Sequence, residues 1–454
     1  MAHHPCTCCI IPPHMLRQLA AAACSEAERC DLLDQAALSA RLRDRRRLAG
    51  AATVSSGSAA TAAAATTAVL TAAATGAVST ATVSTGPVTT GPVATGPVTT
   101  AVVPTRGVPQ VTATAAAART SRSTTPAATG FPATAAASSL ADTAPAGVAD
   151  ARGLARVNAL APALSNESHL GKQRGVYDAG QLGRLPGTLL RAEGGQAVPD
   201  QQANQAYDGA GITYDFLRAV FNRDSIDGRG RRLDSTIHYQ QHFNNAFWNG
   251  DQMVYGDGDG KSFIGFTRCI DVIAHELTHG LIQYAVPGGL DYEGQSGALN
   301  ESIADVFGSV VKQWSLGQSV GEADWLIGHG IMGPGVGKAL RSLADPGNRE
   351  LTWSGDDQPK TLAAYVADGA VHTNSGIPNH AFYALCMALG GHAWDRAAPI
   401  WYHALALLTP TATFADMARA TGRSAARLYG AGSSVQRAVQ SAWQLVGVNE
   451  LEGR

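Results

Sequence analysis

The sequence predicts an α+β fold in which a β-rich lobe, residues 169–269, precedes an α-helical lobe, residues 270–454. The first lobe is rich in Gly, Asn, Asp, Tyr and Phe, and its short runs Ser235–Gln240 and Gln252–Tyr255 lie between turn residues, as strands do. The junction is expected near Cys269. The second lobe shows helical periodicity in Ile270–Tyr284, Gly297–Trp314, Ile377–Leu389, Ala397–Leu408, Phe414–Tyr429 and Ser433–Val446.

Residues 1–50 form a separate N-terminal segment. Helical periodicity occurs in His14–Ala23 and Asp31–Leu48, and the segment contains the basic run Arg45–Arg47. A segment of this length buries too little apolar surface to stabilise a core alone. We therefore expect it either to dock on a larger domain or to be a disordered tail.

The cysteines concentrate in this N-terminal segment. Only Cys269 and Cys386, of seven, fall in the two lobes, so a disulfide framework is not their scaffold, although one bridge there stays open. Cys6, Cys8 and Cys9, with two histidines nearby, offer metal-binding groups. Their spacing matches no zinc knuckle, and a flexible tip is the preferred interpretation.

Residues 51–168 form a low-complexity linker. No charged residue occurs between Ala51 and Thr105, and a Thr-Gly-Pro-Val unit recurs every five positions from Thr85. Proline removes backbone donors, and small side chains offer too little apolar area to offset the entropy of ordering. We expect a disordered tether.

Charge and hydropathy exclude several partners. The net charge is −2, which gives no indication of nucleic-acid or acidic-membrane binding. The apolar pair Ile10–Ile11 is stopped by Pro12–Pro13, whereas a signal peptide needs roughly 7–15 apolar residues. The linker has too few strongly apolar side chains to span a membrane. A usual export signal is therefore not recognised.

The strongest chemical signal is the motif HELTH at His275–His279. On a helix, residues four apart lie on one face, so His275 and His279 can bind one metal ion. Glu276 can then reach a metal-bound water as general base. Because an HExxH motif also occurs by chance in unrelated proteins, this motif alone leaves both catalysis and coincidence open.

A third ligand is available downstream. Catalytic zinc takes three protein ligands and keeps one position for water. In the segment Gly297–Phe307, the apolar residues define one helical face, and Glu301 and Asp305 are four residues apart. One carboxylate can bind the metal while the other orients a ligand histidine from behind. We assign Glu301 as the ligand.

Further motifs carry a resemblance to the thermolysin-like neutral zinc metallopeptidases, over about 280 residues from Arg174 to the C-terminus. They are the run Asn244–Gly250, the loop Met253–Gly260 and the run Gly369–Gly376. The N-terminal stretch Cys9–Leu16 resembles the short pro-region of the protealysin-like branch. The resemblance implies a two-lobe fold with a zinc cleft between the lobes.

The resemblance also implies roles for residues of the cleft. Asn245 and Ala246 would bind the substrate backbone along an edge strand, and Arg341 would hold the carbonyl of the residue after the scissile bond. Tyr292 and His372 would stabilise the oxyanion.

Supporting roles follow from the same resemblance. Asn300 would orient His279, and Asp305 would orient His275. Asp368 would orient His372, because Ala367 stands where the family usually has a carboxylate.

Two other departures from the family pattern matter. His279 and Glu301 are 301 − 279 = 22 positions apart, two more than in the best-known members, and the extra residues are expected near Val286–Gly289. The family's double calcium site looks lost. Asp271 and Asp324 remain there, but the other expected carboxylates are replaced by Lys312, Leu326 and His329. A single calcium ion elsewhere stays open.

The sequence therefore predicts a secreted-type zinc endopeptidase, made as a precursor whose pro-region inhibits it intramolecularly. Its partners would be protein and peptide substrates, with an apolar residue preferred after the scissile bond, and we expect a monomer. A zinc aminopeptidase and a non-catalytic zinc module remain as alternatives. The run Asn244–Trp248 disfavours the first, and the presence of Glu276 and His372 disfavours the second.

Overall fold

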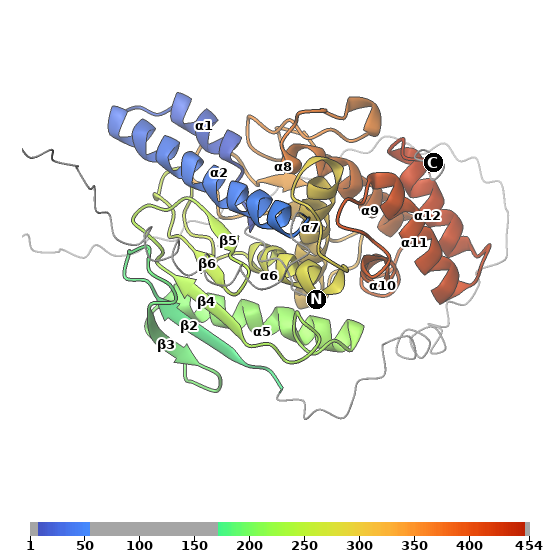
Figure 1. Cartoon of the computed structure of the whole chain (residues 1–454), viewed down its shortest axis with the longest axis horizontal. Coiled ribbons are helices and arrows are strands. Elements are labelled where there is room, and N and C mark those ends of the chain that lie inside the picture. The colour runs from blue at the N-terminus through green and yellow to red at the C-terminus, as the bar shows by residue number, and fades with distance from the viewer. Residues whose placement is uncertain (1–7, 55–170, 450–454) are drawn as a thin grey trace, which may run out of the picture. The chain divides into compact units, whose positions relative to one another are not determined.

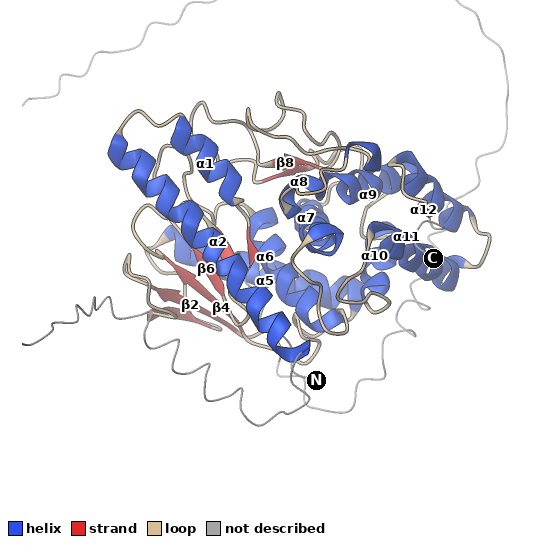
Figure 2. Ribbon diagram, turned by 45° about the horizontal axis from the view of Figure 1, so that its top comes forward, coloured by secondary structure: helices blue, strands red, loops and turns tan. Residues whose placement is uncertain are grey.

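The computed structural model describes residues 8–54 and 171–449, and within 42–54 it describes the backbone alone. Figure 2 shows the long strands on one side and most helices on the other, which confirms the α+β class. The strands are β1 (Cys8–Cys9), β2 (Arg174–Asp178), β3 (Thr188–Ala192), β4 (Leu233–Ile237), β5 (Ala246–Trp248), β6 (Met253–Tyr255), β7 (Leu326–Ile327) and β8 (Arg341–Ser342). The α-helices are α1 (Pro13–Ala21), α2 (Glu26–Val54), α5 (Gln201–Phe221), α6 (Ile270–Ala285), α7 (Gly294–Leu316), α8 (Val371–Asn374), α9 (Gly376–Leu389), α10 (Ala397–Leu405), α11 (Phe414–Tyr429) and α12 (Ser434–Leu445).

A six-stranded mixed sheet forms the first lobe, in the order β1-β5-β6-β4-β2-β3. Strands β2, β4 and β6 are parallel, whereas β3, β5 and β1 each run antiparallel to their neighbour. Strand β1 comes from the N-terminal segment and extends the sheet beyond β5. The short strands β7 and β8 pair separately in the second lobe.

The N-terminal segment docks on the rest of the described chain. Figure 1 shows α1 and α2 side by side, and the Gln35 side chain of α2 hydrogen-bonds the backbone of His242 and Asn244. Of the two expectations for this segment, docking is therefore correct for residues 8–41. The linker predicted at 51–168 lies outside the described residues, except that α2 continues to Val54.

The sequence predicts a β-rich first lobe and does not predict helix α5, which lies within it. It begins where the Asp200 side chain accepts hydrogen bonds from the N–H groups of Gln202 and Ala203, and it ends at a left-handed Asn222. Its glycines indicate turns rather than a helix when the sequence is read alone. A Cβ on Gly209 would lie 2.4 Å from Cδ1 of Ile273, so this glycine allows α5 to approach α6 rather than making a turn.

Strand β4 ends earlier than its predicted boundary at Gln240, because His238 adopts a left-handed conformation with φ 52°. Its ring lies between two carboxylates, 2.8 Å from Asp257 Oδ1 and 2.7 Å from Asp200 Oδ2. The hydrogen bond to Asp257 outweighs partial burial and, with Asp200, raises the pKa of His238 to about 9.

This cluster predicts a pH-dependent contribution to stability. Because the folded pKa lies above the unfolded value of about 6.5, the stabilisation is complete below pH 6.5 and is lost as the pH rises through about 9. Denaturant unfolding across that range should show a decreasing free energy of unfolding, and His238→Gln should remove much of the decrease. His242, also left-handed but exposed, provides the control His242→Gln. Equal slopes in all three proteins would contradict this account.

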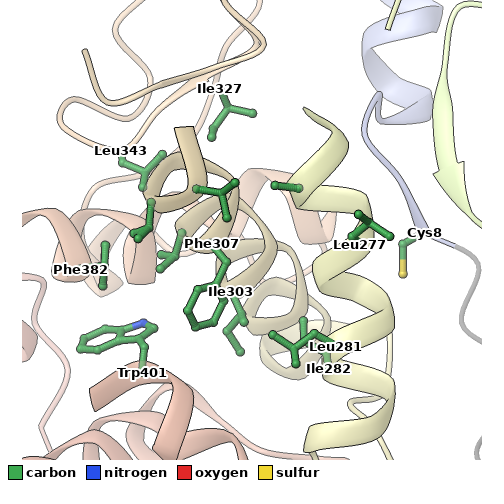
Figure 3. Packing of buried hydrophobic residues seen from close by; sticks show 14 of the residues in the cluster. Cys8, Leu277, Leu281, Ile282, Ile303, Phe307, Ile327, Leu343, Phe382 and Trp401 are labelled. Carbon is green, nitrogen blue, oxygen red and sulfur yellow. The ribbon is translucent and has the colours of Figure 1, made fainter. Parts of the chain in front are cut away.

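Helices α6 and α7 form the centre of the second lobe. Figure 3 shows Leu281 and Ile282 of α6 beside Ile303 of α7, and all three side chains are buried. Burial of each such side chain contributes about 1.5–3 kcal/mol to stability. The helix α6 begins at the N-cap Cys269 and ends before Pro287, which lacks a backbone donor. Among the described helices, none is both long and apolar enough to cross a membrane.

Candidate active site

The two central helices bring the predicted metal ligands together. His275 and His279 lie one turn apart on α6, and Glu301 faces them from α7. The helices approach closely because Gly308 has no side chain: a Cβ there would lie 2.6 Å from the carbonyl oxygen of Asp271 and 3.4 Å from Cβ of His275. A larger residue at this position would push the two helices apart.

The three side chains converge on one point. His275 Nε2 lies 3.1 Å from His279 Nε2, and the Glu301 carboxylate oxygens lie 3.5 Å and 3.8 Å from these two nitrogens. All three side chains are inaccessible to solvent. This is the donor set, two imidazoles and a carboxylate, that catalytic zinc takes from proteins.

The groups behind the histidines fix which nitrogens face the metal. His275 Nδ1 donates to Asp305 Oδ1 at 2.9 Å, and His279 Nδ1 donates to Asn300 Oδ1 at 2.8 Å. The two Nε2 lone pairs and the Glu301 carboxylate therefore face one another. These electron-rich groups repel one another unless a cation lies between them. Burial alone lowers the pKa of His275, but Asp305 and Glu301 outweigh it and raise this pKa to about 9. The same surroundings favour a bound metal cation.

Asp305 is itself held by two further side chains. Arg341 binds it through two hydrogen bonds of 2.8 Å, and Asn379 Nδ2 donates to it at 2.9 Å. Although burial raises the pKa of Asp305, Arg341 and His275 outweigh it and hold this pKa far below its usual range. Asn379 was not among the predicted residues. Its one sequence signal is an amide in a predominantly apolar helix, α9.

Glu276 is oriented by the edge strand of the sheet. Its Oε2 accepts a hydrogen bond of 2.9 Å from the backbone N–H of Trp248 in β5, and the Trp248 indole N–H donates to Gln283. A residue of α6 is thereby fixed relative to the strand along which a peptide would bind. This placement, beside the histidines but on the side of β5, suits a general base.

Tyr292 and His372 both lie at the Glu301 carboxylate. The Tyr292 hydroxyl donates to Glu301 Oε1, while His372 Nε2 lies 3.1 Å from Glu301 Oε2 and 2.8 Å from the carbonyl oxygen of Cys9. Both side chains are therefore within the site. Asp368, by contrast, is exposed in the loop before α8, and its predicted support of His372 stays a prediction.

The N-terminal segment runs through the site as an extended peptide. Ile10 N–H donates to the Ala246 carbonyl, and Arg341 Nη1 donates to the Ile10 carbonyl at 3.2 Å. The Asn245 side chain accepts from the Ile11 N–H at 2.9 Å and donates to the Ile11 carbonyl at 3.0 Å. The three residues predicted to bind substrate backbone thus contact one continuous stretch of chain.

The cysteine cluster lies elsewhere than predicted. The expectation of a flexible tip is wrong for Cys8 and Cys9, which form β1 and are 0% and 6% exposed. Their position depends on pairing with β5, more than 230 positions away, and no local pattern indicates it. Cys6 and the two neighbouring histidines lie outside the described residues.

Lys312 stands at one of the positions where the sequence comparison led us to expect a calcium-binding carboxylate. Lys312 Nζ lies 3.1 Å from Asp271 Oδ2, 2.7 Å from Asp324 Oδ1 and 2.8 Å from the Leu326 carbonyl. Burial alone lowers the pKa of Lys312, but the two carboxylates outweigh it and raise this pKa. An ammonium group here neutralises the carboxylates that remain.

Comparisons with known proteins agree with this geometry. The model of the thermolysin metallopeptidase catalytic domain matches residues 163–283, and that of its alpha-helical domain matches residues 288–448. An extracellular metalloprotease of Pectobacterium carotovorum subsp. carotovorum is 48% identical over 285 residues, which cover 61% of this chain and 81% of that protein. Protease PrtS of Photorhabdus sp. (strain Az29) is 43% identical over 290 residues, 62% of this chain and 77% of that protein.

A solved structure is similar as well. The precursor of protealysin, a metalloproteinase from Serratia proteamaculans, is 41% identical and superposes with a TM-score of 0.59, covering 66% of this chain and 98% of that one. The family resemblance inferred from the motifs is thereby confirmed. The chain belongs to the thermolysin metallopeptidase family.

Proposed function

We propose that this protein is a zinc endopeptidase that hydrolyses peptide bonds within proteins, and that it is made as a self-inhibited precursor. The observation that carries this proposal is the extended segment Cys8–Ile11 in the cleft. It pairs with β5 and is held by His372, Arg341 and Asn245. A cleft that accommodates chain on both sides of the metal ligands suits an endopeptidase.

The chain's own residues support the reaction. When bound, zinc would act as a Lewis acid and lower the pKa of a water molecule to about 7. Glu276, fixed by Trp248, accepts the proton of the attacking water and later delivers it to the leaving amine. His372 and Tyr292 donate hydrogen bonds to the oxygen on which negative charge develops. In the precursor, the Cys9 carbonyl oxygen occupies the position beside His372.

The same contacts support a specificity. If the Cys9 carbonyl stands in for that of the scissile bond, then Ile10 is the residue after the bond. Its carbonyl is bound by Arg341, the role expected for this arginine, and its side chain is completely buried. We infer a preference for an apolar residue at this position.

The pro-region would act as an intramolecular inhibitor, because it occupies the binding strand. By likeness to extracellular relatives, we infer that the mature enzyme acts outside the cell. A catalytic zinc is part of this proposal, with no double calcium site, and we expect the enzyme to be a monomer. Protein and peptide substrates are its expected partners.

The two alternatives, an aminopeptidase and a non-catalytic zinc module, lead to different expectations. An aminopeptidase binds the free amino group of its substrate, whereas here both Cys8 and Cys9 lie along β5 before the bond at His372. A non-catalytic zinc module has no use for a buried Glu276 held beside the ligands.

Mass spectrometry of the products separates these functions. We expect the activated enzyme to cut casein at internal bonds, mostly before Leu, Ile, Phe or Val. Stepwise loss of N-terminal residues alone would contradict the endopeptidase assignment. Internal cuts with no preference for the following residue would contradict only the inferred specificity.

A further inference from the structure

The sulfur of Cys8 lies among the metal ligands. Among the described residues, Cys8 Sγ forms a group with one ligand atom each from His279 and Glu301, all within 4.8 Å of one another. All three side chains are buried. Zinc binds cysteine thiolate as readily as imidazole and carboxylate, and catalytic zinc keeps one position open. The pro-region therefore places the Cys8 sulfur where it can act as the fourth ligand of the zinc.

Backbone pairing fixes Cys8 in this place. Cys8 pairs with Trp248 and Cys9 pairs with Phe247 across the antiparallel strands β1 and β5. The hydrogen bond between the Cys9 carbonyl oxygen and His372 further fixes the register of β1 against β5. Because successive side chains of a strand point to opposite faces, a shift by one residue would turn Cys8 away from the ligands.

Cys9 provides an internal comparison. Its side chain packs on the other face of β1, in a hydrophobic cluster that includes Phe243 and Phe247. Cys8 belongs to the main core, and Figure 3 shows it beside Leu277 of α6. Burial as a small apolar side chain is sufficient to explain Cys9. It does not explain why Cys8 approaches two metal ligands.

We propose that the Cys8 thiolate is the fourth zinc ligand of the precursor, so that the metal itself locks the pro-region in the cleft. This inference rests on the proposed function and deepens it. On binding, the thiol proton passes to solvent, and a zinc–sulfur bond replaces the bond between zinc and water. Glu276 then has no nucleophilic water to deprotonate, and the Cys9–Ile10 bond lies uncut along β5.

Release of Cys8 from the zinc follows from the same chemistry. An organomercurial chloride forms a mercury–sulfur bond with Cys8 and releases chloride, while the zinc–sulfur bond breaks and water returns to the metal. Removal of the pro-region by proteolysis has the same consequence. Latency is thereby controlled by thiol chemistry as well as by cleavage.

Cobalt substitution tests the bond without reference to activity. Full-length chains carrying Glu276→Gln, which prevents self-cleavage, are loaded with one Co²⁺ each. The proposal predicts a thiolate-to-cobalt charge-transfer band in the near ultraviolet. Cys8→Ser should lose the band, and the matched control Cys9→Ser should keep it. A cobalt-loaded parent without the band, or a Cys8→Ser chain with an unchanged band, would overturn the proposal.

Thiol counting gives a second readout that needs no Cys8 variant, in case that variant does not fold. Ellman's reagent is applied to the folded full-length chain before and after zinc is removed. We expect one additional reactive thiol in the metal-free chain, and we expect Cys9→Ser to retain this difference. An unchanged thiol count would contradict a metal-bound Cys8.

An activity measurement separates failure of this inference from failure of the proposed function. In chains with an intact Glu276, Cys8→Ser should cleave peptides or process itself without a mercurial, whereas the wild type and Cys9→Ser should need one. If the cobalt band is present but no chain ever shows zinc-dependent hydrolysis, the proposed function is wrong and the ligand assignment stands. If trypsin-activated wild type is active but the band is absent, only the ligand assignment is wrong.

Discussion

Glu276→Gln should leave one zinc ion bound and lower peptide hydrolysis by at least 10²–10⁴-fold, on the order of the contribution of a general acid–base group. The substituted amide can keep the hydrogen bond from the Trp248 N–H through its oxygen. Its nitrogen bears two hydrogens and cannot accept a proton from water. The substitution therefore removes the base and preserves the shape of the site.

Initial rates on a fluorogenic peptide, with zinc content determined by mass spectrometry, measure this effect. Wild type and variant are both treated with trypsin, which is then stopped, so that latency does not enter. The exposed Glu350 supplies the control Glu350→Gln, which should leave the rate unchanged. Wild-type turnover by Glu276→Gln, free of contaminating protease, would remove Glu276 from the mechanism.

Lys312→Ala should lower the free energy of unfolding by about 3–5 kcal/mol. Asp271 is 1% exposed and lies 3.1 Å from the Lys312 ammonium, so removal of the lysine leaves a buried carboxylate without its cation. Burial already raises the pKa of Asp271, and loss of Lys312 would raise it further. The carboxylate would then take up a proton as the chain folds.

Urea unfolding of the full-length Glu276→Gln background gives this free energy without self-digestion. The exposed Lys338 supplies the control Lys338→Ala, expected within about 0.5 kcal/mol of the parent. Calcium should leave the unfolding midpoint of the parent unchanged, because the ammonium occupies the position between the carboxylates. A large upward shift of the parent with calcium would contradict the prediction that the double calcium site is lost.

The proximity of the candidate metal ligands could be predicted from sequence because local helix geometry places them. Residues four apart share a helix face, which relates His275 to His279 and Glu301 to Asp305 without knowledge of the fold. The two helices were paired because catalytic zinc needs a third protein ligand, which the second helix offers. Gly308 makes that close pairing possible, and its role is visible only when the neighbouring helix is known.

What sequence analysis missed depends on distant contacts. Helix α5 was not predicted, because a glycine such as Gly209 is usually a turn signal. In the structure, Gly209 instead allows α5 to pack against Ile273. Asn379 contributes through Asp305, 74 positions earlier in the chain. Cys8 reaches the metal ligands only through the pairing of β1 with β5. In each case the residue's neighbours are set by tertiary structure.

Casein hydrolysis as a function of bound zinc tests whether this protein is a zinc endopeptidase. The purified chain, after brief trypsin treatment stopped with a trypsin inhibitor, is assayed as prepared, after chelation, and after zinc is restored. Metal content and intact mass are followed in parallel. We expect hydrolysis to disappear when the zinc is removed and to return when the zinc is restored. Hydrolysis that persists unchanged in a chain shown to contain no metal would contradict the assignment.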